Sequence, residues 1–260
     1  MIEIESLILE EKFVIAESKI LDLFVDYEPI FEFDIMVAAQ LCALNKHFYL
    51  SLEFLEKAIK KGVEVENIKN LAVFEPVFEL EKWKKLEKRL DRLQYNYLVS
   101  INFELAKEFE RRFKAEQAAK GTDRFDEVVQ DNFNHIIEVI AQYGFPGEEL
   151  IGAKTYTVTT TLVNQEYAFS LLQEELLEAL KKGQLQPSGF LYIYKYEARK
   201  ISINYRDQAP PVEIDLPEFN IVALPESDSK ILREERYKLG ISSVGLMEKK
   251  AVRQKYGLRF

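Results

Sequence analysis

The chain has 260 residues and a mass of 30.4 kDa, with 44 acidic and 35 basic side chains and a net charge of −9 at pH 7. A hydrophobic fraction of 47% with only 10 Gly and 8 Pro excludes the disordered, collagen-like and low-complexity classes. One cysteine, Cys42, excludes a disulfide framework, and with only two histidines, His47 and His135, we expect no metal site and no cofactor.

The charge is unevenly distributed along the chain. Residues 1–34 carry −8, residues 230–260 carry +6, and the residues between them carry −7. The overall negative charge argues against a general nucleic-acid binder. Residues 1–15 carry acids where a secretory signal needs basic residues, and no apolar run is long enough to cross a membrane. We therefore expect a cytoplasmic protein that does not bind membranes.

The first two-thirds of the chain shows apolar residues at helical spacing. Residues 4–26 fit an amphipathic helix, although 13–15 are also compatible with the start of a strand. Residues 33–62 predict two helices joined by a turn at 45–47, with Gly62 as the C-cap of the second helix. Small residues on the first helix would let the two helices approach closely.

The small and apolar residues of this helix pair have the spacing of a tetratricopeptide repeat, which the pair resembles. The matching positions are Ala39, Cys42, Ser51, Leu55 and Ala58. Residues 67–86 resemble the segment that follows such repeats in many bacterial proteins. A stable solenoid needs about three units, and one is visible here. We therefore interpret the pair as a repeat-like hairpin used for packing rather than as a peptide groove.

Residues 81–118 are strongly amphipathic, and their spacing changes near 94–100, which predicts a kink or break. We favour a connecting helix that covers a core over a coiled-coil partner strip. The segment 114–123 is small and polar and contains Gly121. It predicts a boundary between a repeat-like region, 1–120, and a mostly helical domain with short strands, 121–260.

The second half contains a helix that ends in Tyr143-Gly-Phe-Pro146, followed by Gly152, and a later segment Arg233–Ser243. With residues 165–185, these pieces resemble a bacterial domain family of unknown function that is often linked to tetratricopeptide-like segments. The resemblance covers residues 123–250. It implies a mostly helical domain and supplies no activity.

The chain departs from that family at its most distinctive motifs. A Gln-His pair is replaced by Asn164-Gln165, and an Asp-Arg pair by Glu197-Ala198-Arg199. Of a Gln-x-Tyr-Gly-Thr-Gln box, Tyr205 and Gln208 remain in register. If the family has a histidine-dependent site, this chain has lost the histidine.

The family comparison still gives one candidate cluster, formed by Gln165, Glu197, Arg199, Tyr205 and Gln208. As an active site, Arg199 with Tyr205 would bind an anion and Glu197 would act as a base. As a structural feature, the cluster would be a buried hydrogen-bond network. We favour the network.

Local structure is ambiguous in three segments of this half. Residues 155–163 have strand-like β-branched composition, whereas the resemblance implies a helix, which we favour. Residues 189–207 show aromatic alternation compatible with a strand or with a helix leading into one. Residues 212–225 are expected to be extended.

These patterns together predict a mainly α protein: a repeat-like helical hairpin packed on a mostly helical domain with a small β element. We expect a non-catalytic protein that binds a basic protein partner, in one version an immunity-type protein that neutralises a toxin. A degenerate or cryptic hydrolase-like enzyme is the alternative. A nucleic-acid or membrane contact through the basic tail is weaker, because cations also favour a helix C-terminus. The tail residues are Lys249, Lys250, Arg253, Lys255 and Arg259.

The candidate partner-binding residues come from the acidic N-terminal region and from a run of tyrosines. The acids are Glu10, Glu11, Glu17, Asp22 and Asp26, and the tyrosines are Tyr192, Tyr194 and Tyr196. Tyrosine is enriched at protein interfaces, but alternate tyrosines are also typical of a half-exposed strand. The sequence alone does not indicate an oligomeric state.

Overall fold

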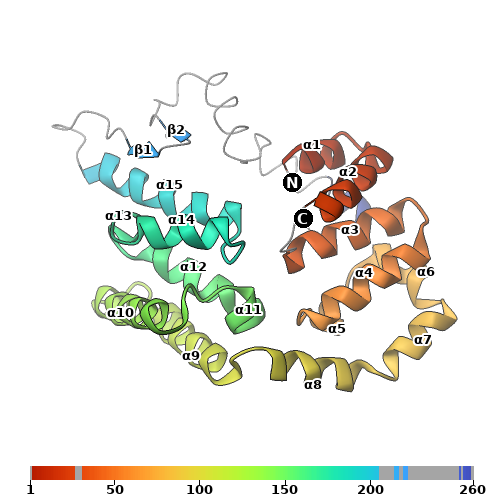
Figure 1. Ribbon diagram of the computed structural model, residues 1–260, viewed down its shortest axis with the longest axis horizontal. Coiled ribbons are helices and arrows are strands. Elements are labelled where there is room, and N and C mark those ends of the chain that lie inside the picture. Colours follow the sequence, from red (N-terminus) through yellow and green to blue (C-terminus); the bar gives the residue numbers. More distant parts are fainter. Residues whose placement is uncertain are drawn as a thin grey trace. The chain divides into compact units, whose positions relative to one another are not determined.

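A computed structural model describes residues 2–26, 31–204, 214–216, 219–221, 252 and 254–258 (Figure 1). The chain is mainly helical and forms two compact units. Among these residues, unit 1 draws on Met1–Ala106, Glu148–Ala153 and Val244–Phe260, and unit 2 on Lys107–Gly147 and Lys154–Ser243. None of the helices in this part of the chain is both long enough and apolar enough to span a bilayer.

Unit 1 consists of short helices. They are α1 (Ile2–Leu9), α2 (Phe13–Asp26), α3 (Glu32–Leu44), α4 (Phe48–Lys60), α5 (Val65–Lys69), η1 (Ala72–Phe74), α6 (Glu75–Phe78), α7 (Glu81–Glu87), α8 (Leu90–Ser100) and α11 (Glu148–Ile151). The 3-10 turn η2 (Gly152–Lys154) follows α11.

The segment 4–26, predicted as a helix, is broken into α1 and α2. Glu11 has a positive φ of 58°, a left-handed conformation that ends a right-handed helix. The periodicity was therefore the correct signal, and the alternative strand at 13–15 is wrong because those residues form the first turn of α2.

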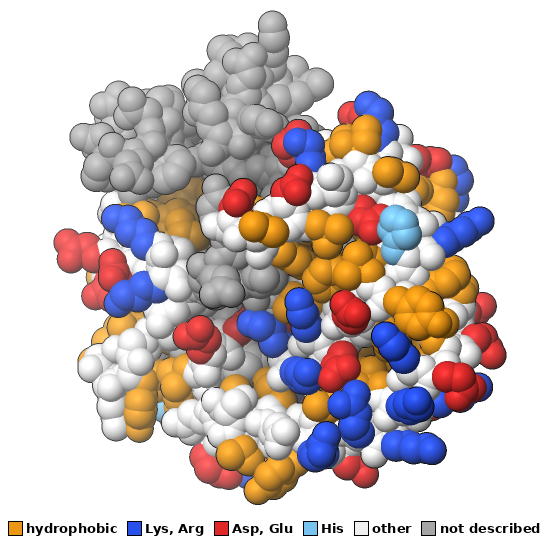
Figure 2. Space-filling view, turned by 45° about the vertical axis from the view of Figure 1, so that its right-hand side comes forward, with side chains coloured by type: hydrophobic (Ala, Val, Ile, Leu, Met, Phe, Trp, Pro, Cys, Tyr) orange, Lys and Arg blue, Asp and Glu red, His pale blue; other side chains and the backbone are white. Residues whose placement is uncertain are grey.

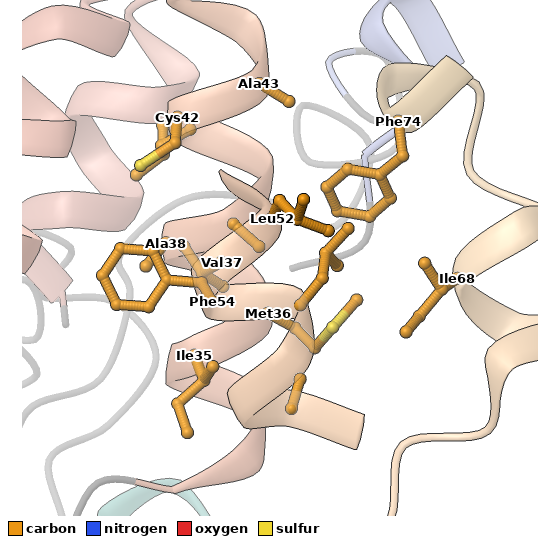
Figure 3. Close-up of a cluster of buried hydrophobic side chains, with 14 of the residues drawn as sticks. Ile35, Met36, Val37, Ala38, Cys42, Ala43, Leu52, Phe54, Ile68 and Phe74 are labelled. Carbon is orange, nitrogen blue, oxygen red and sulfur yellow. The ribbon is translucent and has the colours of Figure 1, made fainter. Parts of the chain in front are cut away.

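The helices α3 and α4 lie side by side (Figure 1) and contribute many of the residues in the core of unit 1. Lys46, with φ of 65°, reverses the chain in the predicted turn at 45–47. Small residues allow the predicted close approach, since the Ser51 hydroxyl donates to the Ala39 carbonyl at 2.8 Å. Figure 3 shows Ile35, Met36 and Phe54 in the core that these helices form with Phe74 of η1.

Tyr97 of α8 fixes the segment 148–153 within unit 1. Its hydroxyl accepts a hydrogen bond from the Ala153 N–H at 3.0 Å. Its ring lies against Gly62 and Gly152, and a Cβ at either glycine would overlap the ring. Both glycines also have positive φ, 97° and 60°, which other residues rarely adopt.

The described helices of unit 2 range from 4 to 19 residues. They are α9 (Phe103–Ala119, shared with unit 1 at its start), α10 (Phe125–Tyr143), α12 (Thr155–Asn164), α13 (Ala168–Leu171), α14 (Gln173–Lys181) and α15 (Pro187–Asn204). Two three-residue strands, β1 (Ile214–Leu216) and β2 (Phe219–Ile221), pair antiparallel with Asp215 opposite Asn220.

Two ambiguous segments of unit 2 are helices. In α12, the hydroxyls of Thr157 and Thr160 donate to the carbonyls of Lys154 and Tyr156, three and four residues earlier. Threonine is thereby accommodated inside a helix despite its β propensity. Residues 189–204 belong to α15.

The segment 81–118, for which one break was predicted near 94–100, has breaks at 88–89, between α7 and α8, and at 101–102, between α8 and α9. The predicted boundary segment 114–123 does not separate the two units, because it lies in unit 2, at the end of α9 and the turn before α10. A polar, glycine-containing turn within a helical hairpin has the same composition as an interdomain linker, so composition could not distinguish the two.

Candidate protein-binding face and polar clusters

The outer side of α2 combines exposed aliphatic and acidic side chains. Val14, Ile15 and Val25 are 70%, 49% and 85% exposed. Asp22 and Asp26 are also exposed, and helical spacing places them on the same side as these three residues. We call this set, Val14, Ile15, Asp22, Val25 and Asp26, the α2 face.

The acids of the α2 face have no cation in the described part of the chain, unlike their neighbours. Glu10 is exposed and pairs with Lys12 at 2.7 Å, and Glu3 pairs with Lys19 at 2.8 Å. Figure 2 shows acidic and basic side chains mixed over one side of the molecule, with hydrophobic side chains between them. A partner would therefore meet local pairs of charges rather than a field of one sign.

Glu17, predicted as a partner-binding acid, is instead buried at 4% exposure. Its carboxylate accepts hydrogen bonds from Asn45 Nδ2 at 2.5 Å and from His47 Nδ1 at 2.7 Å. A carboxylate can only accept, so this contact requires a proton on Nδ1 and orients the imidazole, whose side chain is 60% exposed. Glu17 is thus an internal anchor for the α3–α4 turn. The prediction that it contacts a partner is wrong because the side chain is inaccessible.

Cys42 lies next to this anchor and is fully buried. Burial, and then the Glu17 carboxylate, raise the pKa of the thiol well above its ordinary value. A protonated thiol is a poor nucleophile. The side chain therefore acts as a small core residue. His47 and Cys42 both lie close to Glu17, but the protonated thiol is not activated as a nucleophile.

Glu11 is exposed, and the described residues near the C-terminus contact it. Lys255 Nζ lies 2.6 Å from Oε1, and the Tyr256 hydroxyl donates to Oε2. These two hydrogen bonds, that of Lys255 being the larger influence, lower the pKa of Glu11. The candidate acids thus fall into four groups: Asp22 and Asp26 on the α2 face, Glu10 paired with Lys12, Glu17 buried, and Glu11 bound to Lys255 and Tyr256.

The three candidate tyrosines lie on α15, where helical geometry separates them. Tyr192 and Tyr196, four residues apart, are 54% and 38% exposed, with ring centroids 5.8 Å apart. Tyr194 is 6% exposed and packs on Phe169 at 5.0 Å. Burial raises the pKa of Tyr194. Tyr192 and Tyr196 are therefore accessible to a partner, and Tyr194 is a core residue.

Glu197, a member of the family-derived cluster, caps the N-terminus of α13. Its carboxylate accepts from the backbone N–H of Phe169 at 2.6 Å and from the N–H and hydroxyl of Ser170. These N–H groups begin a helix and lack intrahelical acceptors, so the carboxylate satisfies them. Glu197 is 7% exposed.

The rest of that cluster is not brought together by the described contacts. Gln165 is half-buried and donates to Gln130 Oε1 at 3.1 Å. The side chain of Arg199, and Tyr205 and Gln208, lie outside the described residues.

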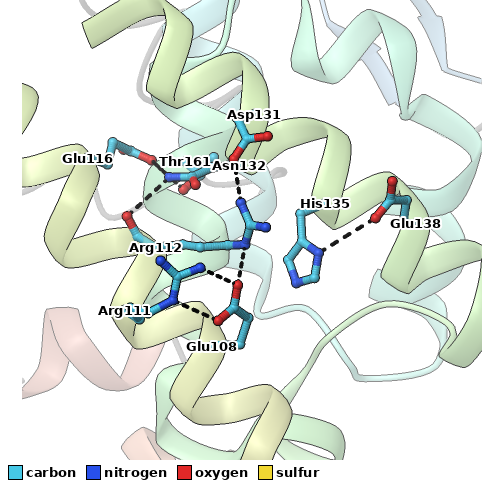
Figure 4. A network of polar contacts seen from close by, with 9 residues as sticks. All are labelled: Glu108, Arg111, Arg112, Glu116, Asp131, Asn132, His135, Glu138 and Thr161. Carbon is cyan, nitrogen blue, oxygen red and sulfur yellow. Dashed lines mark hydrogen bonds and ion pairs between the residues drawn. The ribbon is translucent and has the colours of Figure 1, made fainter. Parts of the chain in front are cut away.

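The densest polar cluster in the described part of unit 2 surrounds Glu116 and was not predicted (Figure 4). Glu116 has no exposed surface. It accepts hydrogen bonds from Asn132 Nδ2 at 2.9 Å, Thr161 Oγ1 at 2.7 Å and Asn164 Nδ2 at 2.6 Å. The donors come from α10 and α12, so one carboxylate ties three helices together. Glu116 continues the apolar stripe of Phe109 and Phe113 on α9, and this spacing was the available signal.

A charged group borders this network. Arg112 contacts Glu108 at 2.8 Å and Asp131 at 2.6 Å. Arg111 and Arg112 lower the pKa of Glu108 to about 2. His135 Nδ1 lies 3.8 Å from the Glu138 carboxylate, while Asp131 pairs with Arg112. Burial, and then Arg112, lower the pKa of His135, so the imidazole is neutral near pH 7.

Comparisons with known proteins return no family model, no curated protein and no solved structure that matches the chain. Among the described residues, no group of three or more His, Cys, Asp or Glu side chains is arranged to hold a metal ion. The geometry of the residues themselves is therefore the basis for the function proposed below.

Proposed function

We propose that the protein is a non-catalytic cytoplasmic protein that binds a basic protein partner through the α2 face. The observation that carries the proposal is Val25, 85% exposed between Asp22 and Asp26. An aliphatic side chain this exposed gains about 1–2 kcal/mol when a partner covers it. Two carboxylates without a described cation favour a partner that presents Lys or Arg around an apolar patch.

The charge pattern supports the same partner chemistry. Asp22 and Asp26 are exposed and have no cation among the described residues, so a positive partner would be attracted locally to the α2 face. Such attraction mainly accelerates encounter, whereas the aliphatic residues of the α2 face would supply affinity. An immunity-type protein that occludes a basic toxin is one concrete form of this proposal. The repeat-like hairpin α3–α4 would serve as the rigid support behind α2.

The hydrolase-like alternative stays a prediction. Glu197 is occupied by the backbone and hydroxyl donors of α13, which supports the reading of this residue as structural. Of the basic tail, Lys255 pairs with Glu11, and Lys249, Lys250, Arg253 and Arg259 lie outside the described residues.

The test is capture of partners by purified protein from the native cell, with quantitative mass spectrometry. We compare the unaltered chain with Asp22→Lys/Asp26→Lys and with a control, Glu53→Lys/Glu66→Lys. The control makes the same change in net charge at exposed acids elsewhere on unit 1. We expect a stoichiometric basic protein with the unaltered chain and the control, and at least about tenfold less with the α2-face variant.

Two outcomes contradict the proposal. Equal capture by all three proteins would exclude the α2 face, and the lack of any stoichiometric basic partner would exclude the function. Raising the salt concentration should weaken capture by the unaltered chain, because interactions between exposed charges are screened.

A further inference from the structure

Residues 254–258, here called the C-terminal segment, pack against unit 1 like a bound peptide. Leu258 is 7% exposed and belongs to the same hydrophobic core as α1 to α8. The Tyr256 ring meets the Phe13 ring edge-on, with centroids 4.9 Å apart. More than 240 residues separate these partners in sequence, so the segment reaches its site as a separate piece of chain.

The polar contacts of the segment have the form of ligand recognition. Both oxygens of the Glu11 carboxylate are used, one by Lys255 and one by the Tyr256 hydroxyl. Glu11 has a left-handed backbone, with φ of 58°, in the short turn between α1 and α2. One residue in an uncommon conformation therefore receives two adjacent side chains of the segment.

The backbone of the segment favours glycine at position 257, between Tyr256 and Leu258. Gly257 has φ of 63°, and a Cβ there would lie 3.5 Å from the Ala72 side chain. Other residues adopt this backbone reluctantly. The bound sequence is thus Lys-Tyr-Gly-Leu: a cation and an aromatic hydroxyl for Glu11, a glycine at the bend, and a leucine in the core.

The attachment combines one buried side chain with partly buried and exposed contacts. Tyr256 and Val252 are partly buried, Leu258 is buried, and the ion pair is solvent-exposed, with side-chain exposures of 58% and 42%. Exposed ion pairs are weak and screened by salt. A segment anchored in this way can be exchanged for another of the same chemistry without dismantling the helices.

We propose that the surface formed by Glu11, Phe13 and Ala72–Val73 is a peptide-binding site that the chain's own C-terminal segment fills. A partner carrying a basic residue followed by Tyr-Gly-aliphatic competes with the segment for this site. The competing partner rests on the proposed function, because the site lies at the start of α2. The occupation of the site by residues 254–258 does not depend on it.

The test uses full-length protein and a fluorescent peptide with the sequence of residues 250–260, KAVRQKYGLRF. A release variant, Tyr256→Ala/Leu258→Ser, frees the site. A blocked variant adds Glu11→Gln and Phe13→Ala to the release variant, and a control adds Glu53→Gln and Tyr49→Ala, both exposed residues of unit 1. Far-UV circular dichroism verifies that each variant is folded.

We expect the unaltered chain to bind the peptide weakly, since its own segment competes, and the release variant to bind at least about tenfold more tightly. The blocked variant should lose that gain and the control should keep it. A release variant that binds no better than the unaltered chain, or a blocked variant that binds as well as the control, overturns the proposal. The first result would mean that the segment is a permanent part of the core.

A second measurement needs no substitution. Excess isotope-labelled peptide should increase hydrogen exchange in the chain's own C-terminal residues, because it displaces them, and unchanged exchange overturns the proposal. The two proposals fail separately. Peptide binding without capture of a basic partner overturns the proposed function alone, whereas capture through the α2 face without peptide binding overturns this inference alone.

Discussion

The two units each bury a glutamate, but the groups that surround it differ. In unit 1, Glu17 is bonded by Asn45 and by the half-exposed His47. In unit 2, Glu116 is bonded by two amides and a hydroxyl, and no part of it reaches solvent. Glu116 holds helices together. Glu17 also orients the imidazole of His47, which is accessible to solvent. Unit 1 therefore has an exposed imidazole held in place by a buried acid, and it also carries the α2 face.

The largest expected effect comes from removing the enclosed carboxylate. Glu116→Ala removes the acceptor shared by Asn132, Thr161 and Asn164, of which the first two are buried, and should cost about 3–5 kcal/mol of unfolding free energy. Hydrogen exchange in α10 and α12 measures it, with exposed Glu127→Ala as the control. A cost near that of the control would show that Glu116 is not needed to hold these helices.

A smaller effect is expected from the matched change in unit 1. Glu17→Ala should cost about 1–2 kcal/mol, because Asn45 and His47 can turn toward water once the carboxylate is gone. Trp83, the single tryptophan, is buried in unit 1, so its fluorescence during urea unfolding reports this unit. If Glu17→Ala costs as much as Glu116→Ala, the distinction between the two carboxylates fails.

The smallest expected effect is on the response of the two units to pH. Burial, and then Glu148 and Glu5, raise the pKa of Asp34 in unit 1 to about 6 from 3.8. The folded state then holds its proton more tightly than the unfolded state, so stability falls as pH rises from about 4 to 6. Asp34→Asn should stabilise unit 1 at pH 7 by about 1 kcal/mol and flatten this slope, as followed by Trp83 fluorescence.

Unit 2 should respond in the opposite sense. The pKa of Glu108 is lowered to about 2 from 4.5, so its contribution is present above pH 4.5 and is lost as pH falls toward 2. Hydrogen exchange in α9 between pH 4.5 and 2 would detect this loss, and Glu108→Gln should remove it. Parallel pH responses in the two units would contradict the assignment of these two carboxyls.

Helix positions followed from the sequence because apolar periodicity survives local exceptions. The pair 33–62 and the helix at 125–143 could be predicted from spacing and from their glycine caps. The break at Glu11 was not predictable, since glutamate carries no signal for a left-handed backbone. The family-like motifs also gave the wrong emphasis, because the acid at the centre of the described polar network is Glu116 rather than Glu197.

The inward and outward positions of the α2 acids could also be predicted from the sequence. Glu17 follows Phe13 by one helical turn and precedes Ile20, so it occupies an inward position of α2, whereas Asp22 and Asp26 occupy outward ones. Helical position therefore distinguishes the buried Glu17 from the exposed Asp22 and Asp26, whereas the number of acids does not. The contact between Glu11 and Lys255 could not be predicted, because no local pattern specifies which distant cation reaches an exposed acid.

The composition of unit 1 from separated stretches bears on how the protein is made. Its core includes Leu258, near the end of the chain, and takes in residues 148–153 from the middle. During synthesis on the ribosome, α1 to α8 emerge first, and the contacts of Leu258 and Tyr256 can form only after these two residues have also emerged. The described helices of unit 2 lie between these stretches in the sequence, so they are all synthesised before unit 1 has its last core residue. The N-terminal helices are therefore synthesised first, but their core is completed only when Leu258 is available.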